Sequence, residues 1–284
     1  MRKIQIEAPA KINLTIDVLF KRPDGYHEVE MIMQTIGLKD VVDIELLSEK
    51  SIKVTSDCES IPNDETNLVW QAADMMINEY RLDAGLKIHI HKRIPVAAGL
   101  AGGSADAAAV IRGINELFDL KGAEELLKRL GKNLGADVPF CIQGGTALAR
   151  GIGDELKALD SIPDAVVLLI KPPIFISTKE VYSRLNLKNM TQRPDTKTML
   201  INIQRKDLKS ICDGLCNVLE TVSFDIHPQL RQIKQKLVQF GALGSLMSGS
   251  GPTIYGIFEG KDDAQKAAEK MVKNDYFFCL TQVD

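Results

Sequence analysis

The chain has 284 residues, of which 45% are hydrophobic and 26% are charged, and its formal net charge is -3 at pH 7. This composition is ordinary for a soluble protein, and the length allows two hydrophobic cores. The small negative charge argues against strong attraction to nucleic acid or to an anionic membrane. Any phosphate site must therefore be built locally, from a few cations and backbone amides.

The sequence also indicates a cytoplasmic protein. It has no apolar run long enough to span a bilayer, and residues 1–7 alternate polar and apolar side chains instead of forming the core of a signal peptide. An odd number of cysteines without framework spacing favours reduced thiols: Cys58, Cys141, Cys212, Cys216 and Cys279. We interpret Cys212 and Cys216, four apart in an expected helix, as small packing residues and not as metal ligands.

Strands are predicted over residues 2–8 and 11–19, because hydrophobic and polar side chains alternate there. In the second strand Ile12, Leu14, Ile16 and Val18 take one face, and Lys11, Asn13, Thr15 and Asp17 take the other. Residues 21–27 contain Pro-Asp-Gly and should form a loop. Further strands are expected over 29–36 and 41–47, separated by Lys39 and Asp40.

A helix over 67–80 and a strand over 86–91, which leads to Ile94 and Pro95, are predicted next. His89 and His91 share a face of that strand, and an exposed strand face explains them better than a metal does, since no third ligand is evident. Ser104 should cap a helix that continues to about Leu117. A helix over 124–134, a break at 135–140 and a strand region from Gly144 complete this part.

The stretch before the helix at Ser104 is the most informative one. Gly99, Gly102 and Gly103 stand with small residues where backbone amides and the positive end of a helix dipole can face an anion. The pattern is neither of the two common phosphate fingerprints, so it argues against a P-loop enzyme and a nicotinamide dehydrogenase. The structural alternative is a tight loop whose glycines only relieve strain.

The composition shifts near residues 154–163, and the C-terminal part is expected to form a two-layer α/β domain. We expect a strand over 166–170, a helix over 179–185, an irregular polar loop over 188–198, helices over 198–220 and 228–240, a glycine-rich loop over 241–252, a strand over 253–258, an amphipathic helix over 262–274 and a strand over 277–283. The predicted domains are residues 1–157 and residues 158–284.

Three stretches taken together resemble the galactokinase–homoserine kinase–mevalonate kinase superfamily. They are residues 9–14, which contain Lys11 and Asn13, the glycine-rich residues 95–109 and the second glycine-rich loop at 246–252. Residues 22–27 and 135–139 narrow the resemblance to the branch that acts on 4-diphosphocytidyl-2-C-methyl-D-erythritol. The similarity covers nearly the whole chain, and the order of the motifs makes it specific.

The resemblance implies an α+β, two-domain small-molecule kinase with its active site in the cleft between the domains. Residues 1–157 would form the ATP-binding domain and residues 158–284 the substrate domain. It implies transfer of the γ-phosphate of ATP, with Mg²⁺, to the 2-hydroxyl of a cytidine diphosphate-linked sugar alcohol. Asp137 would be the catalytic carboxylate and Lys11 its cationic neighbour, meeting at the turn that begins at Gly99. Asn13 and Asp137 would hold the acceptor, and Tyr26, His27 and Tyr182 its cytidine. ATP phosphates would lie against Pro95, Val96, Ala97, Ala98, Gly99, Leu100, Ala101, Gly102, Gly103, Ser104 and Ala105.

Positioning and charge neutralisation dominate phosphoryl transfer, and this residue set supplies both. Taken singly, Asp137 could be a helix cap and Lys11 an exposed strand lysine. Asp106 could be an acidic magnesium ligand or a dipole-stabilising residue, and no magnesium ligand is assigned. Ala101 stands where many relatives have glycine, and Tyr182 where many have phenylalanine. Asn67 and Lys92 are candidates to contact the adenine.

Two other functions remain open. The first is a kinase of the same superfamily that acts on homoserine or mevalonate. These acceptors contain no base that could stack on Tyr26 and Tyr182, which argues against this function. A non-catalytic nucleotide- or sugar-binding regulator would not need both Lys11 and Asp137. We expect no nucleic-acid or membrane partner, and either a monomer or a homodimer.

Overall fold

The computed structural model describes residues 2–271 and 275–284. Its strands are β1 (Lys3–Lys21), β2 (His27–Leu47), β3 (Ile52–Ser56), β4 (Gly85–His91), β5 (Thr146–Arg150), β6 (Glu155–Ala158), β7 (Val166–Lys171), β8 (Cys216–Asn217), β9 (Gly244–Met247), β10 (Ile254–Phe258) and β11 (Phe277–Gln282). Its helices are α1 (Leu68–Tyr80), α2 (Gly102–Leu117), α3 (Glu124–Lys132), α4 (Val138–Gln143), α5 (Thr178–Arg184), the 3-10 turn η1 (Leu187–Asn189), α6 (Thr196–Gln204), α7 (Leu208–Asp213), α8 (Glu220–Ile226), α9 (Gln229–Gln239) and α10 (Lys261–Met271).

The chain folds into two compact units whose segments alternate along the sequence. The first unit contains the residues up to Ala10, Leu38–Val96 and Ala101–Gly144, and the second contains Lys11–Gly37, Ala97–Leu100 and Gly145–Asp284. β1 and β2 each contribute residues to both units, and residues 97–100 belong to the second unit although the chain on either side of them belongs to the first. The division between residues 157 and 158 treats each domain as one continuous stretch and stays a prediction.

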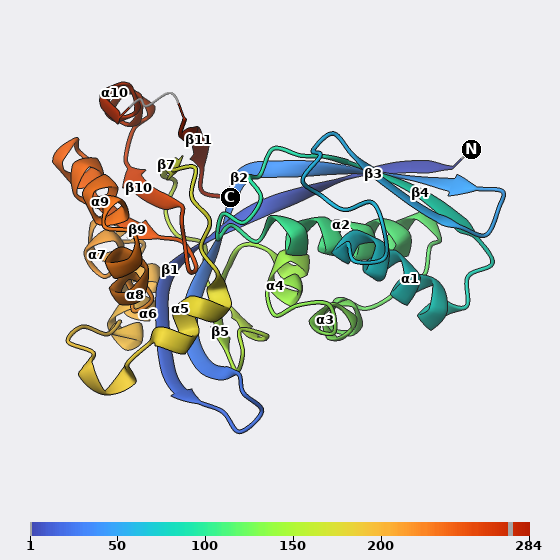
Figure 1. Cartoon of the computed structure of the whole chain (residues 1–284), viewed down its shortest axis with the longest axis horizontal. Coiled ribbons are helices and arrows are strands. Elements are labelled where there is room, and N and C mark those ends of the chain that lie inside the picture. Colours follow the sequence, from blue (N-terminus) through green and yellow to red (C-terminus); the bar gives the residue numbers. More distant parts are fainter. Residues whose placement is uncertain (1, 272–274) are drawn as a thin grey trace. The chain divides into compact units, whose positions relative to one another are not determined.

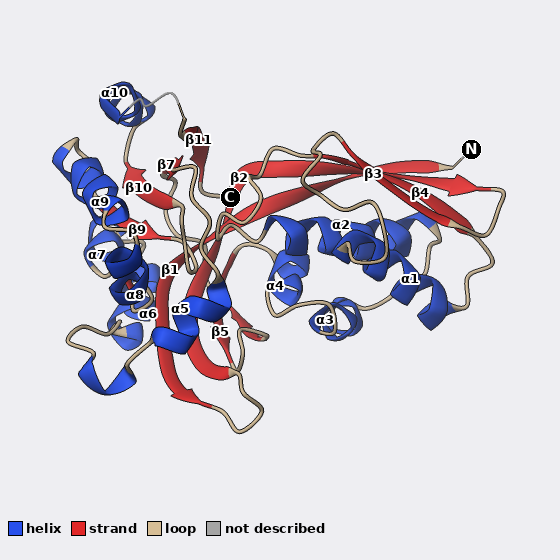
Figure 2. Ribbon diagram, viewed as in Figure 1, coloured by secondary structure: helices blue, strands red, loops and turns tan. Residues whose placement is uncertain are grey.

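The first unit is a sheet covered by helices. β3 pairs in parallel with β4, and β4 pairs antiparallel with the C-terminal part of β2. Helices α1 and α2 lie against each other and cover one face of these strands (Figures 1 and 2). Close packing is possible because α2 presents Gly113 to the sheet, where a Cβ would come within 2.5 Å of Ile44 Cδ1.

The second unit contains an antiparallel sheet in the order β11-β7-β10-β9. Every residue of β7 from Val166 to Ile170 is buried, as expected for a central strand. Helix α9 packs on β9 and β10, and α10 packs on β7 and β10. β5 extends the N-terminal part of β2, and β8 pairs in parallel with β1 at Thr15 and Ile16.

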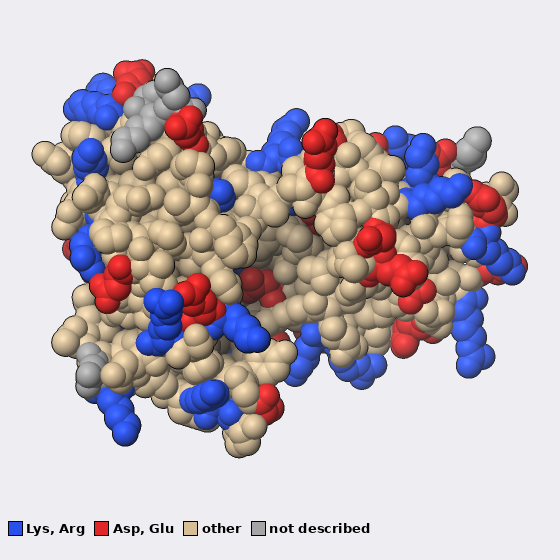
Figure 3. All heavy atoms as spheres, viewed as in Figure 1, with Lys and Arg blue, Asp and Glu red and all other residues tan. Residues whose placement is uncertain are grey.

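Two surface properties follow from the composition. On the face shown in Figure 3, Lys and Arg side chains are interspersed with Asp and Glu side chains, as the small net charge leads one to expect. Among the described residues, no helix combines the length and the apolar character needed to cross a bilayer.

Several predicted elements need correction. The strands predicted over 2–8 and 11–19 are one strand, β1, and those over 29–36 and 41–47 are one strand, β2. Asp40 stays within β2 because its carboxylate accepts hydrogen bonds from the backbone of Arg93 and Ile94. β3 and β6 were not predicted, and the glycine-rich loop expected over 241–252 contains β9. The break expected at 135–140 contains the start of α4.

The predicted helix over 198–220 is wrong. It is divided into α6, α7, β8 and α8, because Lys206 has a positive φ of 56° and Asp207 begins a new helix by capping the amide of Ser210. Cys212 and Cys216 consequently lie on different elements. The loop predicted over 188–198 contains part of η1 and the start of α6. The predicted end of the 262–274 helix lies outside the described residues.

Candidate active site

The polar face of β1 is the centre of the site in the second unit. Lys11 is 4% exposed and Asn13 is fully buried, so an exposed strand lysine is the wrong interpretation of Lys11. The ammonium of Lys11 donates a 2.8 Å hydrogen bond to Asn13 Oδ1. Burial of a lysine is costly unless polar groups compensate it. This strand therefore holds a cation in a fixed, partly desolvated position.

The second glycine-rich loop is fastened to Asn13. The amide of Gly249 donates to Asn13 Oδ1 at 3.1 Å, and the hydroxyl of Tyr255 donates to the carbonyl of Asn13 at 2.8 Å. From the other side, Asn217 Nδ2 donates to the carbonyls of Met247 and Gly249, both at 2.8 Å. The loop is thus positioned by side chains of β1 and β8, while Tyr255 of β10 holds the backbone of β1 at Asn13.

The two glycine-rich stretches lie side by side in the second unit. Ser248 Oγ donates to the carbonyl of Gly99 at 2.8 Å, and the amide of Lys11 donates to the carbonyl of Leu100 at 3.2 Å. A Cβ on Gly99 would lie 2.2 Å from the carbonyl oxygen of Ser248, and the φ of Gly99 is +76°. Only glycine fits this contact.

The start of α2 lies in the first unit and differs from the prediction. Ser104 is not the N-cap: Ala101 takes that position with a left-handed backbone (φ 59°), and it makes no side-chain capping bond. Ser104 instead lies within the first turn. The first amides of α2 therefore lack the side-chain oxygen that usually satisfies one of them, which leaves room for an external anion.

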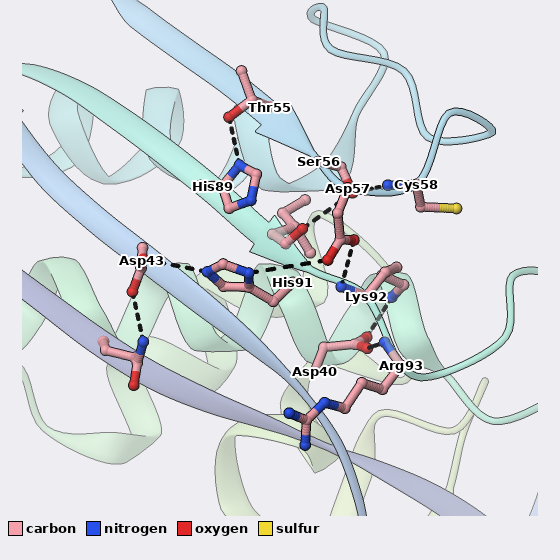
Figure 4. Close-up of polar contacts among 12 residues, drawn as sticks. Asp40, Asp43, Thr55, Ser56, Asp57, Cys58, His89, His91, Lys92 and Arg93 are labelled. Carbon is pink, nitrogen blue, oxygen red and sulfur yellow. Dashed lines mark hydrogen bonds and ion pairs between the residues drawn. The ribbon is translucent and has the colours of Figure 1, made fainter.

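A buried ion cluster supports this helix start. Lys92 Nζ donates to Asp40 Oδ2 and, at 2.7 Å, to Asp106 Oδ2, and all three side chains are at most 6% exposed (Figure 4 shows Asp40 and Lys92). A Cβ on Gly102 would come within 3.1 Å of the same ammonium. Of the two interpretations of Asp106, neither describes its main contact, which is an ion pair with Lys92.

The cluster changes the ionisation of its members. Burial raises the pKa of Asp106 to about 7, with Asp40 adding to this rise and Lys92 opposing it. Burial disfavours the charged form of Lys92, but the two carboxylates outweigh this and raise its pKa. Asp106 Oδ1 is buried and has no hydrogen-bond partner among the described residues.

A second polar network covers the outer face of β4. His91 lies between Asp43, 3.3 Å from Nε2, and Asp57, 4.0 Å from Nδ1 (Figure 4). His89 contacts Thr55 Oγ1 at 2.8 Å, and the two imidazoles meet edge to face with centroids 4.5 Å apart. Within residues 2–271 and 275–284, no group of three or more His, Cys, Asp and Glu side chains has the arrangement of a metal site.

Asp137 directly precedes α4. It occupies the N-cap position, yet its side chain makes no capping bond, so helix capping does not account for this carboxylate. Gly135, two residues earlier, lies close to the first turn of α2: a Cβ on Gly135 would be 3.9 Å from Ser104 Oγ. The first unit therefore brings the segment of Asp137 next to the start of α2. Lys11 belongs to the second unit, and its meeting with Asp137 stays a prediction.

Two of the three predicted cytidine-binding residues lie together. The rings of His27, at the start of β2, and Tyr182, on α5, have centroids 5.1 Å apart and are tilted by 39°. Burial and, to a smaller extent, Lys21 lower the pKa of His27, which favours the neutral imidazole. Tyr26 is 61% exposed and offers its ring to solvent.

With this geometry in place, comparisons with known proteins identify the family. The model of the GHMP kinases N terminal domain matches residues 67–145, and that of the GHMP kinases C terminal matches residues 199–276. The 4-diphosphocytidyl-2-C-methyl-D-erythritol kinase of Clostridioides difficile strain 630 is 49% identical over 95% of this chain and 92% of its own length. The chain belongs to the GHMP kinases.

Other members of this GHMP kinase family are similar over their whole length. The 4-diphosphocytidyl-2-C-methyl-D-erythritol kinase of Acetivibrio thermocellus is 47% identical over 99% of both chains. A crystal structure of 4-(cytidine 5'-diphospho)-2C-methyl-D-erythritol kinase superposes with a TM-score of 0.82 at 31% identity, covering 99% of this chain and 100% of that one. Homoserine kinase from Cytophaga hutchinsonii shares the fold at 20% identity, with a TM-score of 0.79, covering 100% of this chain and 95% of that one. The predicted fold class is confirmed.

Sequence reasoning missed several side chains that shape this GHMP kinase site. Asn217 holds the second glycine-rich loop, Tyr255 holds the backbone of Asn13, and Asp40 holds both the ammonium of Lys92 and the backbone that follows it. None of these residues belongs to a local motif. Their partners lie tens to hundreds of residues away, so only the folded chain reveals the contacts.

Proposed function

We propose that this GHMP kinase transfers the γ-phosphoryl group of ATP to the 2-hydroxyl of 4-diphosphocytidyl-2-C-methyl-D-erythritol, in the non-mevalonate route to isoprenoids. The observation that carries this proposal is the proximity of Gly135 to Ser104, which brings the segment of Asp137 next to an uncapped helix start. The relatives named as kinases of this compound support the choice of acceptor. We place the reaction in the cytoplasm, where thiols stay reduced.

The phosphates of ATP would be held by residues 95–105. The turn at Gly99 and the first amides of α2 supply donors, and the helix dipole favours negative charge at this end. The Lys92 cluster would keep the helix start in place, because Gly102 lies directly against its ammonium.

Magnesium fits this arrangement as an ion that arrives with the nucleotide. Mg²⁺ usually takes most of its ligands from phosphate and water and few from protein, and the described residues form no dedicated carboxylate cage. We propose the Ser104 hydroxyl as the protein oxygen beside it. When bound, the ion neutralises phosphate charge.

Asp137 and Lys11 would divide the chemical work. Asp137 accepts the proton of the acceptor hydroxyl as the bond to phosphorus forms, and Lys11 stabilises the charge that develops on the transferred group. The hydrogen bond from Lys11 to Asn13 keeps the ammonium aimed from a rigid strand. Asn13 would also contact the acceptor.

The cytidine would bind at His27 and Tyr182, with Tyr26 completing the aromatic surroundings. Tyrosine rings offer stacking faces, and the neutral imidazole of His27 offers one donor and one acceptor to the edge of a base. Homoserine and mevalonate have no base, so these three side chains argue against them as acceptors.

The test is an assay of ADP release with three acceptors: 4-diphosphocytidyl-2-C-methyl-D-erythritol, homoserine and mevalonate. We expect turnover with the first alone. Faster turnover with either of the others would assign the chain to another branch of the family. If the protein binds ATP but releases no ADP with any of the three acceptors, the non-catalytic regulator is favoured.

A further inference from the structure

The segment after α5 carries a contact that the proposed reaction leaves unexplained. Arg193 lies in the polar stretch between η1 and α6, which the sequence predicts as an irregular surface loop. Its Nη1 donates to Asp17 Oδ1 at 2.6 Å and to the carbonyl of Val18 at 3.1 Å. Its Nη2 donates to the carbonyl of Leu187 at 3.3 Å. One guanidinium thus ties both Leu187 and the stretch around Arg193 to β1.

The carboxylate that receives Arg193 is unusually placed for a surface ion pair. Asp17 is 8% exposed, whereas exposed ion pairs contribute little because water screens them. Burial raises the pKa of Asp17, and Arg193 opposes this rise. Removing the guanidinium would leave a desolvated carboxylate without its main counter-charge, which is costly.

The same face of β1 carries the site residues. Lys11, Asn13, Thr15 and Asp17 alternate along the strand, and each of the last three holds a different segment. Asn13 accepts from the loop at Gly249, Thr15 Oγ1 accepts from the amide of Ile32, and Asp17 accepts from Arg193. Strand β1 therefore sets the positions of these segments relative to Lys11.

The segment held at Asp17 follows the helix that carries Tyr182: Leu187 and Arg193 lie 5 and 11 residues after Tyr182 in the sequence. Helix α5 ends at Arg184, and the amide of Leu185 donates to the carbonyl of Tyr182 at 3.4 Å. At its other end, α5 is held by the contact between Thr178 Oγ1 and Ser250 Oγ at 2.8 Å. The short helix that carries Tyr182 is thus fixed at one end to the second glycine-rich loop, and the chain that leaves its other end is tied to β1 at Leu187 through Arg193.

We propose that Arg193 and Asp17 form a latch that positions Tyr182 against His27, and so determines affinity for the cytidine part of the acceptor. Arg193 is a positioning residue and does not touch the reacting atoms. This inference rests on the proposed function, because it assumes that the His27–Tyr182 pair receives a pyrimidine nucleotide. The latch acts on acceptor binding and leaves ATP binding and phosphoryl transfer unchanged.

The experiment compares Arg193→Gln with Arg184→Gln in the full-length chain. Arg184 also lies near Tyr182, but its ion pair with Glu180 is exposed, with 59% and 43% of the two side chains accessible. Binding of cytidine 5'-diphosphate is measured by calorimetry, and KM and kcat are measured with 4-diphosphocytidyl-2-C-methyl-D-erythritol. For Arg193→Gln we expect the Kd for cytidine 5'-diphosphate and the KM for the acceptor each to rise about tenfold or more. A rise of this size corresponds to the loss of one charge-assisted contact. Arg184→Gln should behave as the wild type.

Two further measurements separate positioning from simple loss of structure. The KM for ATP and the kcat at saturating acceptor should stay within about twofold of wild type in Arg193→Gln. Arg193→Lys, which keeps the charge but not the forked donor, should fall between wild type and Gln. Asp17→Asn should reproduce the Gln phenotype; if it does not fold, Arg193→Gln alone decides the question.

The outcomes distinguish the latch from the proposed function. If the wild type binds cytidine 5'-diphosphate and phosphorylates the acceptor but Arg193→Gln matches it in Kd and KM, the latch is refuted and the proposed function stands. If kcat falls while KM is unchanged, Arg193 acts on chemistry and the latch is again refuted. If the wild type neither binds the nucleotide nor turns over the acceptor, both ideas fail.

Discussion

Ser248 and Gly99 join two loops that are 149 residues apart in the sequence: the serine hydroxyl donates a 2.8 Å hydrogen bond to the glycine carbonyl. The backbone of Ser248 lies so close that Gly99 has no room for a Cβ. This contact makes the conformation of the first glycine-rich stretch depend on the second.

Gly99→Ala should therefore destabilise the protein by about 2–4 kcal/mol, combining left-handed strain with a backbone clash. Urea denaturation measures the change. Gly241→Ala is the matched control: Gly241 also has a positive φ, but nothing lies within 4 Å of its added Cβ. It should lose only about 1–2 kcal/mol, from strain alone. Equal losses of stability at the two positions would show that Ser248 moves away from the added methyl group without a cost in free energy.

Ala101→Gly should have the opposite effect. Ala101 has a φ of 59° at the start of α2, a conformation that glycine adopts without penalty. Relief of this strain should stabilise the protein by about 1 kcal/mol after the greater freedom of the unfolded glycine is subtracted. Ala109→Gly, in the interior of the same helix, should instead cost about 1 kcal/mol. A loss of stability in Ala101→Gly would mean that the left-handed alanine is not strained.

Asp106 should give the protein a pH-dependent stability. Its pKa is about 7 in the folded state, compared with the ordinary value of 3.8. Between these values the folded state holds a proton that the unfolded state has released, so the free energy of unfolding falls as the pH rises from about 4 to about 7. Asp106→Asn removes this contribution.

The measurement is the difference between the wild-type and Asp106→Asn unfolding free energies across that pH range. Asp213→Asn serves as the control, because Asp213 forms an exposed pair with Lys209. The wild-type curve should fall relative to Asp106→Asn and run parallel to Asp213→Asn. Parallel curves for all three proteins would place the titration of Asp106 outside this range.

Asp137→Ala should abolish turnover while ATP binding stays unchanged. Loss of a general base costs about 10²–10⁴-fold in rate, and the nucleotide would be held by other residues. ADP release and ATP titration measure the two effects. Asp225→Ala, which removes an exposed carboxylate on α8, should behave as the wild type. Unimpaired turnover in Asp137→Ala would remove this residue from the mechanism.

The sequence by itself determined the class of fold and the family, since both are carried by local patterns. The alternation of polar and apolar residues along β1 and the helical spacing of apolar residues in α1 involve only residues close in sequence. The glycine-rich stretches are recognised from their local composition. For the same reason the sequence pointed to Lys11 and Asn13 on one face of a strand. It failed where local preferences compete, as at Lys206 and Asp207, where a single predicted helix is broken.

Only the tertiary structure decided what these residues contact. Three features show this: Lys11 is buried, Lys92 pairs with Asp40 and Asp106, and Arg193 is attached to Asp17. Each depends on segments that are distant in sequence or belong to different elements. Desolvation and the charges brought near by folding fix the protonation of a buried carboxylate such as Asp106, and neither can be read from neighbours along the chain.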